Sequence, residues 1–383
     1  MGVKVLFTLD TLSLGGAELS VLELVKNLRN VEPVVCVTYR ATHHLQGEFE
    51  SAGIKVFFLN ITERFGFVKG INKLKQVIRS EMPDLVHATH FKTEIISRMA
   101  VPGFDIPLIG SLISDTYSKE RYSLVSSRER IKLELYRLLN KITSHRSDYF
   151  ISVAEAIVKP NQRYLSIPAN KIKVIPNGRD VQKYAGALPA LRSDLYHSLK
   201  PSDKVIVSNS RVIKSKGFDE MFSAFSLLCN QRSDLFFLIV GDGYDLNEYV
   251  ALSLQYGIQD KVVFLGNRTD VPQILKACDI FWFASHYEGS PGVVIEGMLS
   301  RLPIIASDIP PVLENLSDGI NALIFSKGDV DGLVSKTLYL LDNWDIRSNL
   351  TENAYELASK KFNIELSARQ HESFYSDVIS SKK

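Results

Sequence analysis

Two successive series of short β-branched runs, each run followed by an amphipathic stretch, constrain the fold of this chain more than any other feature. The first series opens with a run over 3–9, a loop through Leu14-Gly15-Gly16 and a helical stretch over 17–28. The other predicted strands of this series are 31–39, 54–59, 84–88, 106–112, 148–153 and 171–176, and those of the second are 204–210, 236–243, 261–266, 279–285, 302–307 and 321–326. Strands that alternate with helices predict parallel sheets covered by helices. We therefore predict an α/β protein with two doubly wound parallel sheets.

The segment between the two series, residues 176–203, has no clear strand pattern. It carries Pro176, Gly178, Gly186, Pro189 and Pro201. A length of 383 residues also favours two domains of ordinary size. We expect a first domain over 1–182, completed by a C-terminal helix over 363–383, and a second domain over 183–362.

The charge balance argues against a nucleic-acid partner. The formal net charge is only +2 at pH 7, so the chain lacks the strongly basic field that is typical of nucleic-acid binders. Any site for an anion must therefore be local.

The cysteines and the apolar runs indicate the cellular compartment of the protein. Cys36, Cys229 and Cys278 are odd in number, far apart and set among apolar residues, which favours buried free thiols over disulfides or a zinc cluster. No apolar run approaches the roughly 20 residues that span a bilayer, and no secretory apolar segment is evident near residue 1. We expect a cytoplasmic protein.

Ligands of open α/β sheets bind beyond the carboxyl ends of the strands, and two facing sheets predict a central cleft. Gly15 and Gly16 lie directly before a predicted helix, where amides and the helix dipole favour an anion, although a tight turn without a ligand has the same sequence. Arg211 and Lys216 follow the predicted strand 204–210 and are suited to neutralise a diphosphate. A solvated surface loop would also carry such cations.

The segment HYEGSPGVVIE, residues 286–296, places an acid at each end of a strand-to-helix turn. Carboxylates there are suited to accept hydrogen bonds from sugar hydroxyls: Glu296 from a ribose and Glu288 from a transferred hexose. The amides of the donor loop between them would face a phosphate; this loop comprises Gly289, Ser290, Pro291, Gly292 and Val293. Complementation of the helix dipole remains an alternative explanation of Glu296.

Seven motifs occur in a characteristic order along the chain. They are GGAE (15–18), ISVAEA (151–156), VIPNGRD (174–180), SRVIKSKG (210–217), IVGDG (239–243), VVFLG (262–266) and EGSPGVVIE (288–296). Together they resemble the retaining glycosyltransferases of family 4, which have the GT-B fold of two Rossmann-like domains facing a central cleft. The resemblance covers nearly the whole chain. It implies transfer of a sugar, with retention, from a nucleoside-diphosphate donor to a glycan or lipid-linked acceptor in surface polysaccharide or glycolipid biosynthesis.

The resemblance also implies roles for individual residues. Gly15 and Gly16 match the loop near the donor phosphates and reacting sugar, and Arg211 with Lys216 matches the diphosphate-binding basic pair. Glu296 matches the ribose-binding acid, and Glu288 the acid that contacts the donor sugar. Asn267 and Arg268 match the region that contacts the base, with UDP-sugars favoured and GDP-sugars open. Asn177 and Gly178 match the segment that leads into the hinge.

One position departs from the family pattern. Many relatives carry His-x-His where this chain has His87, Thr89 and, one place later, His90. Because a shift of one residue along a strand reverses side-chain direction, His90 is a substitute only after a local rearrangement. We keep His90 beside Glu288 as a catalytic candidate.

We predict neither a metal nor another cofactor, since the nucleotide-sugar is a substrate. Asp329-Val330-Asp331 has the Asp-x-Asp spacing of metal-dependent transferases, but its place before a helical stretch favours helix capping by Asp329. The basic pair and helix N-termini are suited to absorb the charge of the leaving diphosphate.

The segment 119–146 is rich in Lys and Arg and predicts an amphipathic helix on which Ile131, Leu135, Leu138 and Ile142 share a face. We prefer the interpretation in which this face packs on the sheet and the charges meet water. Peripheral contact of the basic side with the inner face of a membrane stays open.

Two other functions share features with this sequence. A Rossmann oxidoreductase is disfavoured because Gly241-Asp242-Gly243 lacks a third glycine at the required spacing. A catalytically silent nucleotide-sugar-binding partner subunit remains the alternative, because Thr89 departs from the family pattern.

Overall fold

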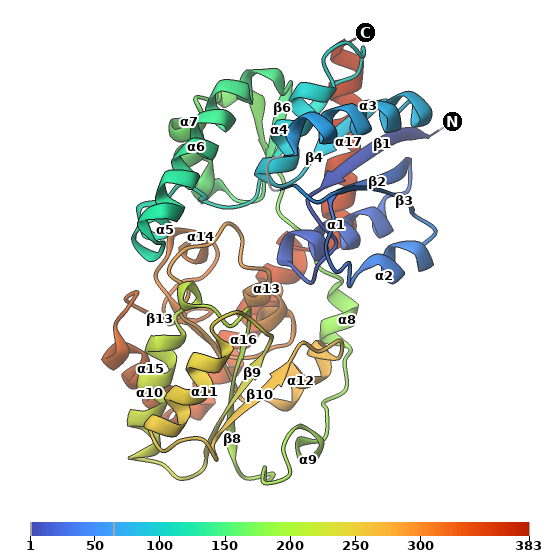
Figure 1. The fold of residues 1–383 in the computed structure, drawn as a ribbon. Coiled ribbons are helices and arrows are strands. Elements are labelled where there is room, and N and C mark those ends of the chain that lie inside the picture. Colours follow the sequence, from blue (N-terminus) through green and yellow to red (C-terminus); the bar gives the residue numbers. More distant parts are fainter. Residues whose placement is uncertain (1, 64–65, 383) are drawn as a thin grey trace. The chain divides into compact units, whose positions relative to one another are not determined.

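The structure, a computed structural model, describes residues 2–63 and 66–382. It divides into two compact units, Met1–Arg179 with Phe362–Lys383, and Asp180–Lys361 (Figure 1). The division lies between Arg179 and Asp180, where we expected it between residues 182 and 183. Residues 1 and 383, which end the expected ranges, lie outside the described residues.

The first unit is built on a seven-stranded parallel sheet in the order β3-β2-β1-β4-β5-β6-β7. The strands are β1 (Val3–Leu9), β2 (Val31–Tyr39), β3 (Lys55–Ile61), β4 (Leu85–Ala88), β5 (Leu108–Leu112), β6 (Tyr149–Ser152) and β7 (Ile172–Val174). The helices are α1 (Gly16–Asn27), α2 (Gln46–Ser51), α3 (Phe67–Glu81), α4 (Phe91–Ala100), α5 (Lys119–Leu124), α6 (Ser127–Thr143), α7 (Val158–Leu165) and α17 (Ile364–Lys382). Strand order reverses between β1 and β4.

Alternate side chains of β1 bury against opposite layers of helices, as the period of two in a strand requires. Phe7 and its neighbours on one face pack with residues of α1, α2 and α17. Leu6 on the other face packs with residues of α3 and α4. The sheet is therefore covered on both faces, which explains its long apolar strands.

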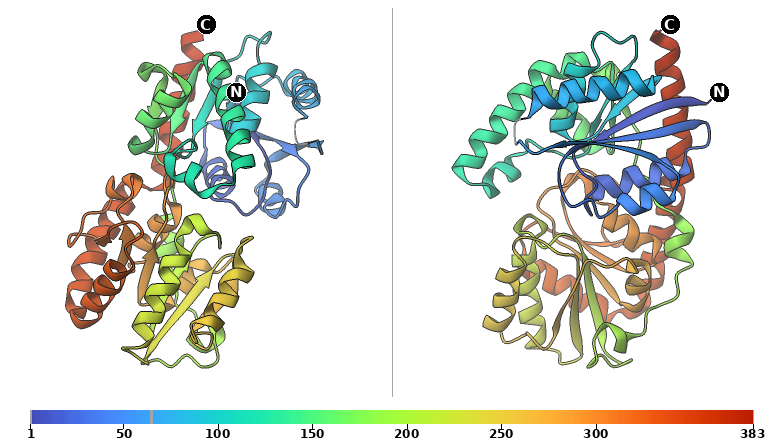
Figure 2. Two further views of the ribbon diagram at one scale, coloured as in Figure 1. Left: turned by 60° about the vertical axis from the view of Figure 1, so that its left-hand side comes forward. Right: turned by 45° about the vertical axis from the view of Figure 1, so that its right-hand side comes forward.

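The C-terminal helix α17, red in Figures 1 and 2, packs against α1 in the first unit. Its Tyr375 is fully buried, and the Tyr375 hydroxyl lies 2.8 Å from Nδ1 of His87 on β4. The other ring nitrogen of His87, Nε2, lies 2.9 Å from Ser111 Oγ on β5. A hydrogen-bonded imidazole thus joins two central strands to the last helix.

The second unit is built on a six-stranded parallel sheet in the order β10-β9-β8-β11-β12-β13. The strands are β8 (Lys204–Asn209), β9 (Leu235–Val240), β10 (Val262–Gly266), β11 (Ile280–Phe283), β12 (Ile304–Ser307) and β13 (Leu323–Phe325). The helices are α8 (Val181–Ala185), α9 (Arg192–Leu195), α10 (Phe218–Cys229), α11 (Leu246–Gln255), α12 (Val271–Ala277), α13 (Gly292–Leu299), α14 (Pro310–Leu313), α15 (Val330–Asp342) and α16 (Arg347–Lys361). Here the order reverses between β8 and β11.

Helices also cover both faces of this sheet. Trp282 of β11 is buried with Phe222 and Phe225 of α10, and its indole donates to Thr337 of α15 at 3.1 Å. Phe281, the preceding residue, faces α13 instead, where a Cβ added to Gly297 would lie 3.3 Å from its ring. The two helices that follow β8 and β11 therefore lie on opposite faces.

Two smaller predictions are confirmed. Asp329 caps α15, since its side chain accepts a hydrogen bond from Gly332 N at 2.9 Å. The cysteines are free thiols: Cys36 and Cys278 are buried and Cys229 is half-buried. Burial raises the pKa of the Cys36 thiol to about 12, so this thiol is unreactive at neutral pH.

The preferred interpretation of segment 119–146 is wrong. The segment forms two helices, α5 and α6, and its apolar face is exposed: the exposed fractions are 71% for Ile131, 48% for Leu135, 49% for Leu138 and 58% for Ile142. α6 instead turns Leu133, Tyr136, Asn140 and Thr143 inward.

A buried cation explains this orientation of α6. Arg98 of α4 is fully buried and pairs with Glu94. Its guanidinium also donates to Asn140 Oδ1 at 2.9 Å, and to Ser147 Oγ at 3.1 Å. Because a buried charge without hydrogen-bond partners costs several kcal/mol, the polar side of α6 faces inward and the apolar stripe is left outside. Within the described parts of the chain, every helix is too short or too polar to span a membrane.

We expect the free energy of unfolding to fall as the pH is lowered from about 7 to about 5. Burial lowers the pKa of His87 from 6.5 to about 3, with a further contribution from His371, and burial lowers the pKa of His371 to about 4. Below about pH 6.5 the unfolded chain therefore binds protons that the folded chain excludes. The free energy of unfolding should then fall by about 1.4 kcal/mol per pH unit for each group that titrates fully.

Urea unfolding at several pH values measures this slope. A His87→Gln variant should flatten it, whereas His145→Gln, which changes an exposed histidine, should leave it as in the parent. An unchanged slope in His87→Gln would contradict the assignment of His87 as a neutral buried group.

Candidate active site

The predicted site residues of the second unit follow the two strands that flank its reversal of strand order. Arg211 and Lys216 follow β8, and Glu288 and Glu296 follow β11. At such a switch point the loops that leave the two strands diverge to opposite faces of the sheet, and open α/β sheets bind ligands in the crevice between them.

Backbone contacts hold the two loops together. Gly217 has φ +73°, and a Cβ on this residue would lie 2.1 Å from the carbonyl oxygen of Ala284 at the end of β11. The amide of His286 donates to Ser215 O at 3.0 Å. Only glycine permits this approach, so the Lys216-Gly217 pair places the lysine directly beside the loop after β11.

Lys216 and Glu288 form an ion pair between these loops. Lys216 Nζ contacts Glu288 Oε1, and Ser285 Oγ donates to the same oxygen at 2.9 Å. The side chains are only 14% and 16% exposed, so their interaction is less screened than that of a surface pair. Arg211, on the same loop as Lys216, has an exposed side chain.

Glu296 lies on α13 and is only 8% exposed. Asn209, the last residue of β8, donates from Nδ2 to Glu296 Oε2 at 2.9 Å. The hydrogen bond therefore links the second acid of the motif to the strand that precedes Arg211 and Lys216. Sequence reasoning missed Asn209, although its place at a strand end beside the switch point is a usable signal.

The donor loop leads into α13. Pro291 is the N-cap, Gly292 is the first helical residue, and Val293 follows in the first turn. Gly289 and Ser290 connect this turn to Glu288. The first amides of a helix have no acceptor within the helix and carry the positive end of its dipole, so the segment has the chemistry of an anion site.

Asn267 and Arg268 follow β10 and lie on a different loop from the acids. Arg268 is held by Asp270 through two hydrogen bonds of 2.8 and 2.7 Å, and Asn267 is exposed. The loop is joined to the end of β9 by Gly241 N, which donates to Gly266 O at 2.8 Å. The loops after β8, β9, β10 and β11 thus lie at one edge of the sheet.

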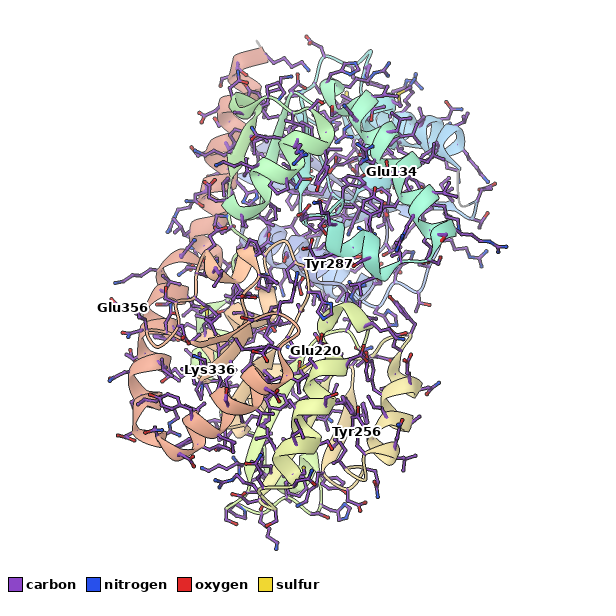
Figure 3. The ribbon with its side chains drawn as sticks, turned by 90° about the vertical axis from the view of Figure 1, so that its left-hand side faces the viewer. Glu134, Glu220, Tyr256, Tyr287, Lys336 and Glu356 are labelled. Carbon is purple, nitrogen blue, oxygen red and sulfur yellow. The ribbon has the colours of Figure 1, made fainter. Side chains whose placement is uncertain are left out.

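A second pair supports the loop after β11 and was missed from the sequence. His286 Nε2 lies 2.8 Å from Oε1 of Glu220, a residue in the first turn of α10. Burial alone would raise the pKa of Glu220, but the hydrogen bond and charge of His286 lower it. The carboxylate thus fixes His286, two residues before Glu288. Figure 3 labels Glu220 and the neighbouring Tyr287.

In the first unit, the glycine loop follows β1, which flanks that unit's own switch point. α1 begins at Gly16 with Gly15 as N-cap. Glu18 is 6% exposed and accepts hydrogen bonds from Thr11 and Ser13 at 3.1 and 3.2 Å. A Cβ on Gly15 would lie 2.2 Å from Glu18 Oε2, so a carboxylate already lies at the N-terminus of α1. This role of Glu18 was also missed.

His90 lies beside this carboxylate. β4 ends at Ala88, so His90 is beyond the strand and the alternation of side-chain direction does not apply to it. It occupies the N-cap position of α4 with φ +74°, a strained conformation for a non-glycine residue, and such strain is frequent at functional sites. Its Nε2 lies 3.8 Å from Glu18 Oε2. Thr89 is buried, 3.4 Å from Ser111 Oγ, so His90 rather than Thr89 adjoins the glycine loop.

Among residues 2–63 and 66–382, no group of three or more His, Cys, Asp or Glu side chains is arranged to hold a metal ion.

Two family models match this chain. The model described as "Glycosyl transferases group 1" matches residues 196–357, and the one described as "Glycosyltransferase Family 4" matches residues 14–183. The chain belongs to the group 1 glycosyltransferases and resembles their family 4. An oxidoreductase is thereby excluded.

Known relatives of this glycosyltransferase extend over most of its length. It is 26% identical over 337 residues to "UDP-Gal:alpha-D-GlcNAc-diphosphoundecaprenol alpha-1,3-galactosyltransferase" of Escherichia coli, covering 82% of this chain and 81% of the relative. It is 24% identical over 364 residues to "N,N'-diacetylbacillosaminyl-diphospho-undecaprenol alpha-1,3-N-acetylgalactosaminyltransferase" of Campylobacter jejuni, covering 93% of this chain and 94% of the relative. Neither supports the alternative of a silent binding subunit.

Solved structures show the fold. The structure of HepE of Anabaena in complex with UDP-glucose matches with a TM-score of 0.83 at 23% identity, covering 99% of both chains. The glycosyltransferase therefore has the GT-B fold that its motifs predicted.

We expect Lys216→Ala to raise the KM for the sugar donor about tenfold to hundredfold, because a hydrogen bond to a charged group contributes about 1.5–3 kcal/mol. Lys214→Ala is the matched control: Lys214 lies two residues away in the same turn, is 51% exposed and pairs with Glu248. Steady-state kinetics with varied donor measures both variants. Equal effects of the two substitutions would contradict a specific role of Lys216.

We expect the protein to bind UDP about tenfold or more tightly than its 2′- and 3′-deoxy analogues. The reason is that each analogue lacks a ribose hydroxyl that could donate a hydrogen bond to the Glu296 carboxylate. Glu296→Ala should remove most of this preference, whereas Glu288→Ala should keep it. Calorimetric titration of the three ligands measures the difference. A preference that survives in Glu296→Ala would assign the ribose contact to another residue.

Proposed function

We propose that this protein is a retaining, metal-independent hexosyltransferase. Its donor is a nucleoside-diphosphate sugar, with a UDP-sugar favoured and a GDP-sugar as the second candidate. Its acceptor is a glycan or a lipid-linked glycan in surface polysaccharide or glycolipid biosynthesis. The names of the relatives in Escherichia coli and Campylobacter jejuni, which describe diphosphoundecaprenol-linked substrates, support this choice of acceptor.

One observation carries the assignment of the donor site. Two contacts connect the segments at the ends of β8 and β11 across the switch point of the second unit. They are the ion pair of Lys216 with Glu288 and the hydrogen bond of Asn209 with Glu296. Cations, a helix N-terminus and two acids at one strand edge match the parts of a sugar nucleotide: diphosphate, hexose and ribose.

In this proposal, each group of the donor has its own partners. Arg211, Lys216 and the amides of Gly289–Val293 bind the diphosphate. Lys216 exchanges Glu288 for a phosphate oxygen, and Glu288 then accepts a hydrogen bond from the donor sugar. Glu296 binds the ribose. Asn267 and Arg268 contact the base.

The reaction follows from these contacts. The bond between the anomeric carbon and the diphosphate oxygen breaks, and a bond to the acceptor hydroxyl forms on the same face of the sugar. The departing phosphate takes the hydroxyl proton, so no side-chain base is needed for this step. Because the acceptor attacks on the same face, no side-chain nucleophile is needed. Lys216, Arg211 and the dipole of α13 stabilise the negative charge that develops on the leaving group. This stabilisation supports independence from a metal.

For the first unit, the proposal keeps the roles that the family resemblance implies. Gly15 and Gly16 act near the donor phosphates and reacting sugar, and His90 joins Glu288 as a catalytic residue. The strained backbone of His90 and its neighbour Glu18 support a functional role for this position. We also propose a cytoplasmic location, with peripheral contact at the inner face of the membrane.

A panel of UDP- and GDP-sugars tests the proposal. We expect one UDP-sugar to raise the melting temperature, since a ligand at a hundred times its dissociation constant stabilises the fold by about 2.7 kcal/mol. With extracted lipid acceptors, that donor should release UDP, and NMR of the product should show the anomeric configuration of the donor. EDTA should leave the rate unchanged.

Each part of the proposal has its own contrary result. If no nucleotide-sugar stabilises the protein, the donor site is wrong. A product of inverted configuration would exclude retention. Loss of activity in EDTA that Mg²⁺ or Mn²⁺ restores would exclude metal independence.

A further inference from the structure

The outward face of α6 is an apolar stripe made of Ile131, Leu135, Leu138 and Ile142. Their spacing of four, three and four residues places them within an arc of roughly 60°, at about 100° per residue. The inward residues of the same helix, among them Leu133 and Asn140, are centred roughly 150° away. The stripe therefore points away from the unit's core, and the buried Arg98 network holds the helix in that orientation.

Cations border the stripe on both sides. By the same helical geometry, Arg128 and Lys132 flank one edge, and Arg130, Arg137 and Lys141 flank the other. α6 carries only two acids: Glu129, which closes the capping box with Ser126, and Glu134, labelled in Figure 3, which pairs with Arg137. Five cations against two acids leave the face basic.

A row of exposed branched side chains is unusual on a folded unit unless a partner covers it. The charges around the row indicate which kind of partner it favours. A second copy of the same face would bring like charges together along both edges, which opposes self-association. An anionic surface gains from the same charges, since Lys and Arg keep their charged ends at the headgroups while apolar side chains enter the acyl boundary.

We propose that α6 docks the first unit onto a bilayer that contains anionic phospholipid, with the apolar stripe inserted and the flanking cations at the headgroups. The inference rests on the proposed function, because a transferase with a lipid-linked acceptor must meet its substrate at a membrane.

Vesicle co-sedimentation tests the proposal with the full chain. We expect binding to vesicles of phosphatidylglycerol and phosphatidylcholine at equal parts, and at least tenfold weaker binding to phosphatidylcholine alone. Binding should weaken as salt rises, because screening reduces the attraction of cations to the headgroups.

Stripe variants locate the contact. Ile131→Glu with Leu135→Glu should reduce binding to the anionic vesicles at least tenfold. Val68→Glu is the matched control, because Val68 is a branched residue on a helix of the same unit and is 74% exposed, against 71% for Ile131. Arg128→Gln with Lys132→Gln should weaken binding to the anionic vesicles and leave binding to phosphatidylcholine unchanged.

Two further measurements distinguish a loss of membrane binding from a loss of folding and from a defect in donor binding. Melting temperatures with and without a UDP-sugar should be the same in the stripe variant and the parent, since the changed residues are exposed. Light scattering should give the same mass for both. If no sugar nucleotide stabilises even the parent, the proposed function fails while the vesicle result still stands by itself.

Four outcomes would overturn the membrane proposal. The parent fails to bind anionic vesicles, or it binds neutral vesicles equally well. The stripe variant binds as tightly as the parent. Light scattering shows a dimer of the parent that the stripe variant dissociates, which would make a second copy the occupant.

Discussion

The reversal of strand order between β8 and β11 is the constraint on which the candidate site depends. Since both strands are central and parallel, their carboxyl ends lie side by side, and the helices that follow them must lie on opposite faces of the sheet. α10 packs with Trp282, and α13 packs on Phe281. The loops between these strands and helices are therefore forced to diverge at one edge. The close approach of Gly217 to Ala284 then brings a lysine from one loop to a carboxylate from the other.

The electrostatics of this edge follow from partial burial. Lys216 and Glu288 are each mostly shielded from water, so each needs a partner of opposite charge. Glu296 has Asn209, and His286 has Glu220. Such pairing keeps the side chains ordered before a ligand arrives, which reduces the entropy that binding must offset. The first unit repeats the plan: Glu18 is held by two hydroxyl groups beneath the glycine loop, with His90 beside it.

The sequence predicted the strands better than it predicted the faces of helices. Each observed strand overlaps a predicted run, because buried parallel strands are marked by short apolar, β-branched segments between turns. Periodicity found the apolar face of α6 but placed it inward, since nothing local to residues 127–143 records that Arg98, on another helix, requires Asn140 and Thr143. For the same reason Asn209 and Glu220 were missed: their partners, Glu296 and His286, lie far away in the sequence. Glu18 was missed although its hydroxyl partners, Thr11 and Ser13, lie only seven and five residues away. His90 was judged by strand alternation, which ends at Ala88.

The central claim is that the loops after β8 and β11 together bind a diphosphate. A crystal structure of the protein with UDP tests it most directly. The account predicts diphosphate oxygens within hydrogen-bond distance of Lys216 Nζ and of the amides at the start of α13, with Glu288 released from Lys216 and a ribose hydroxyl on Glu296. A diphosphate bound at another edge of the sheet, with the Lys216 and Glu288 pair intact, would contradict it.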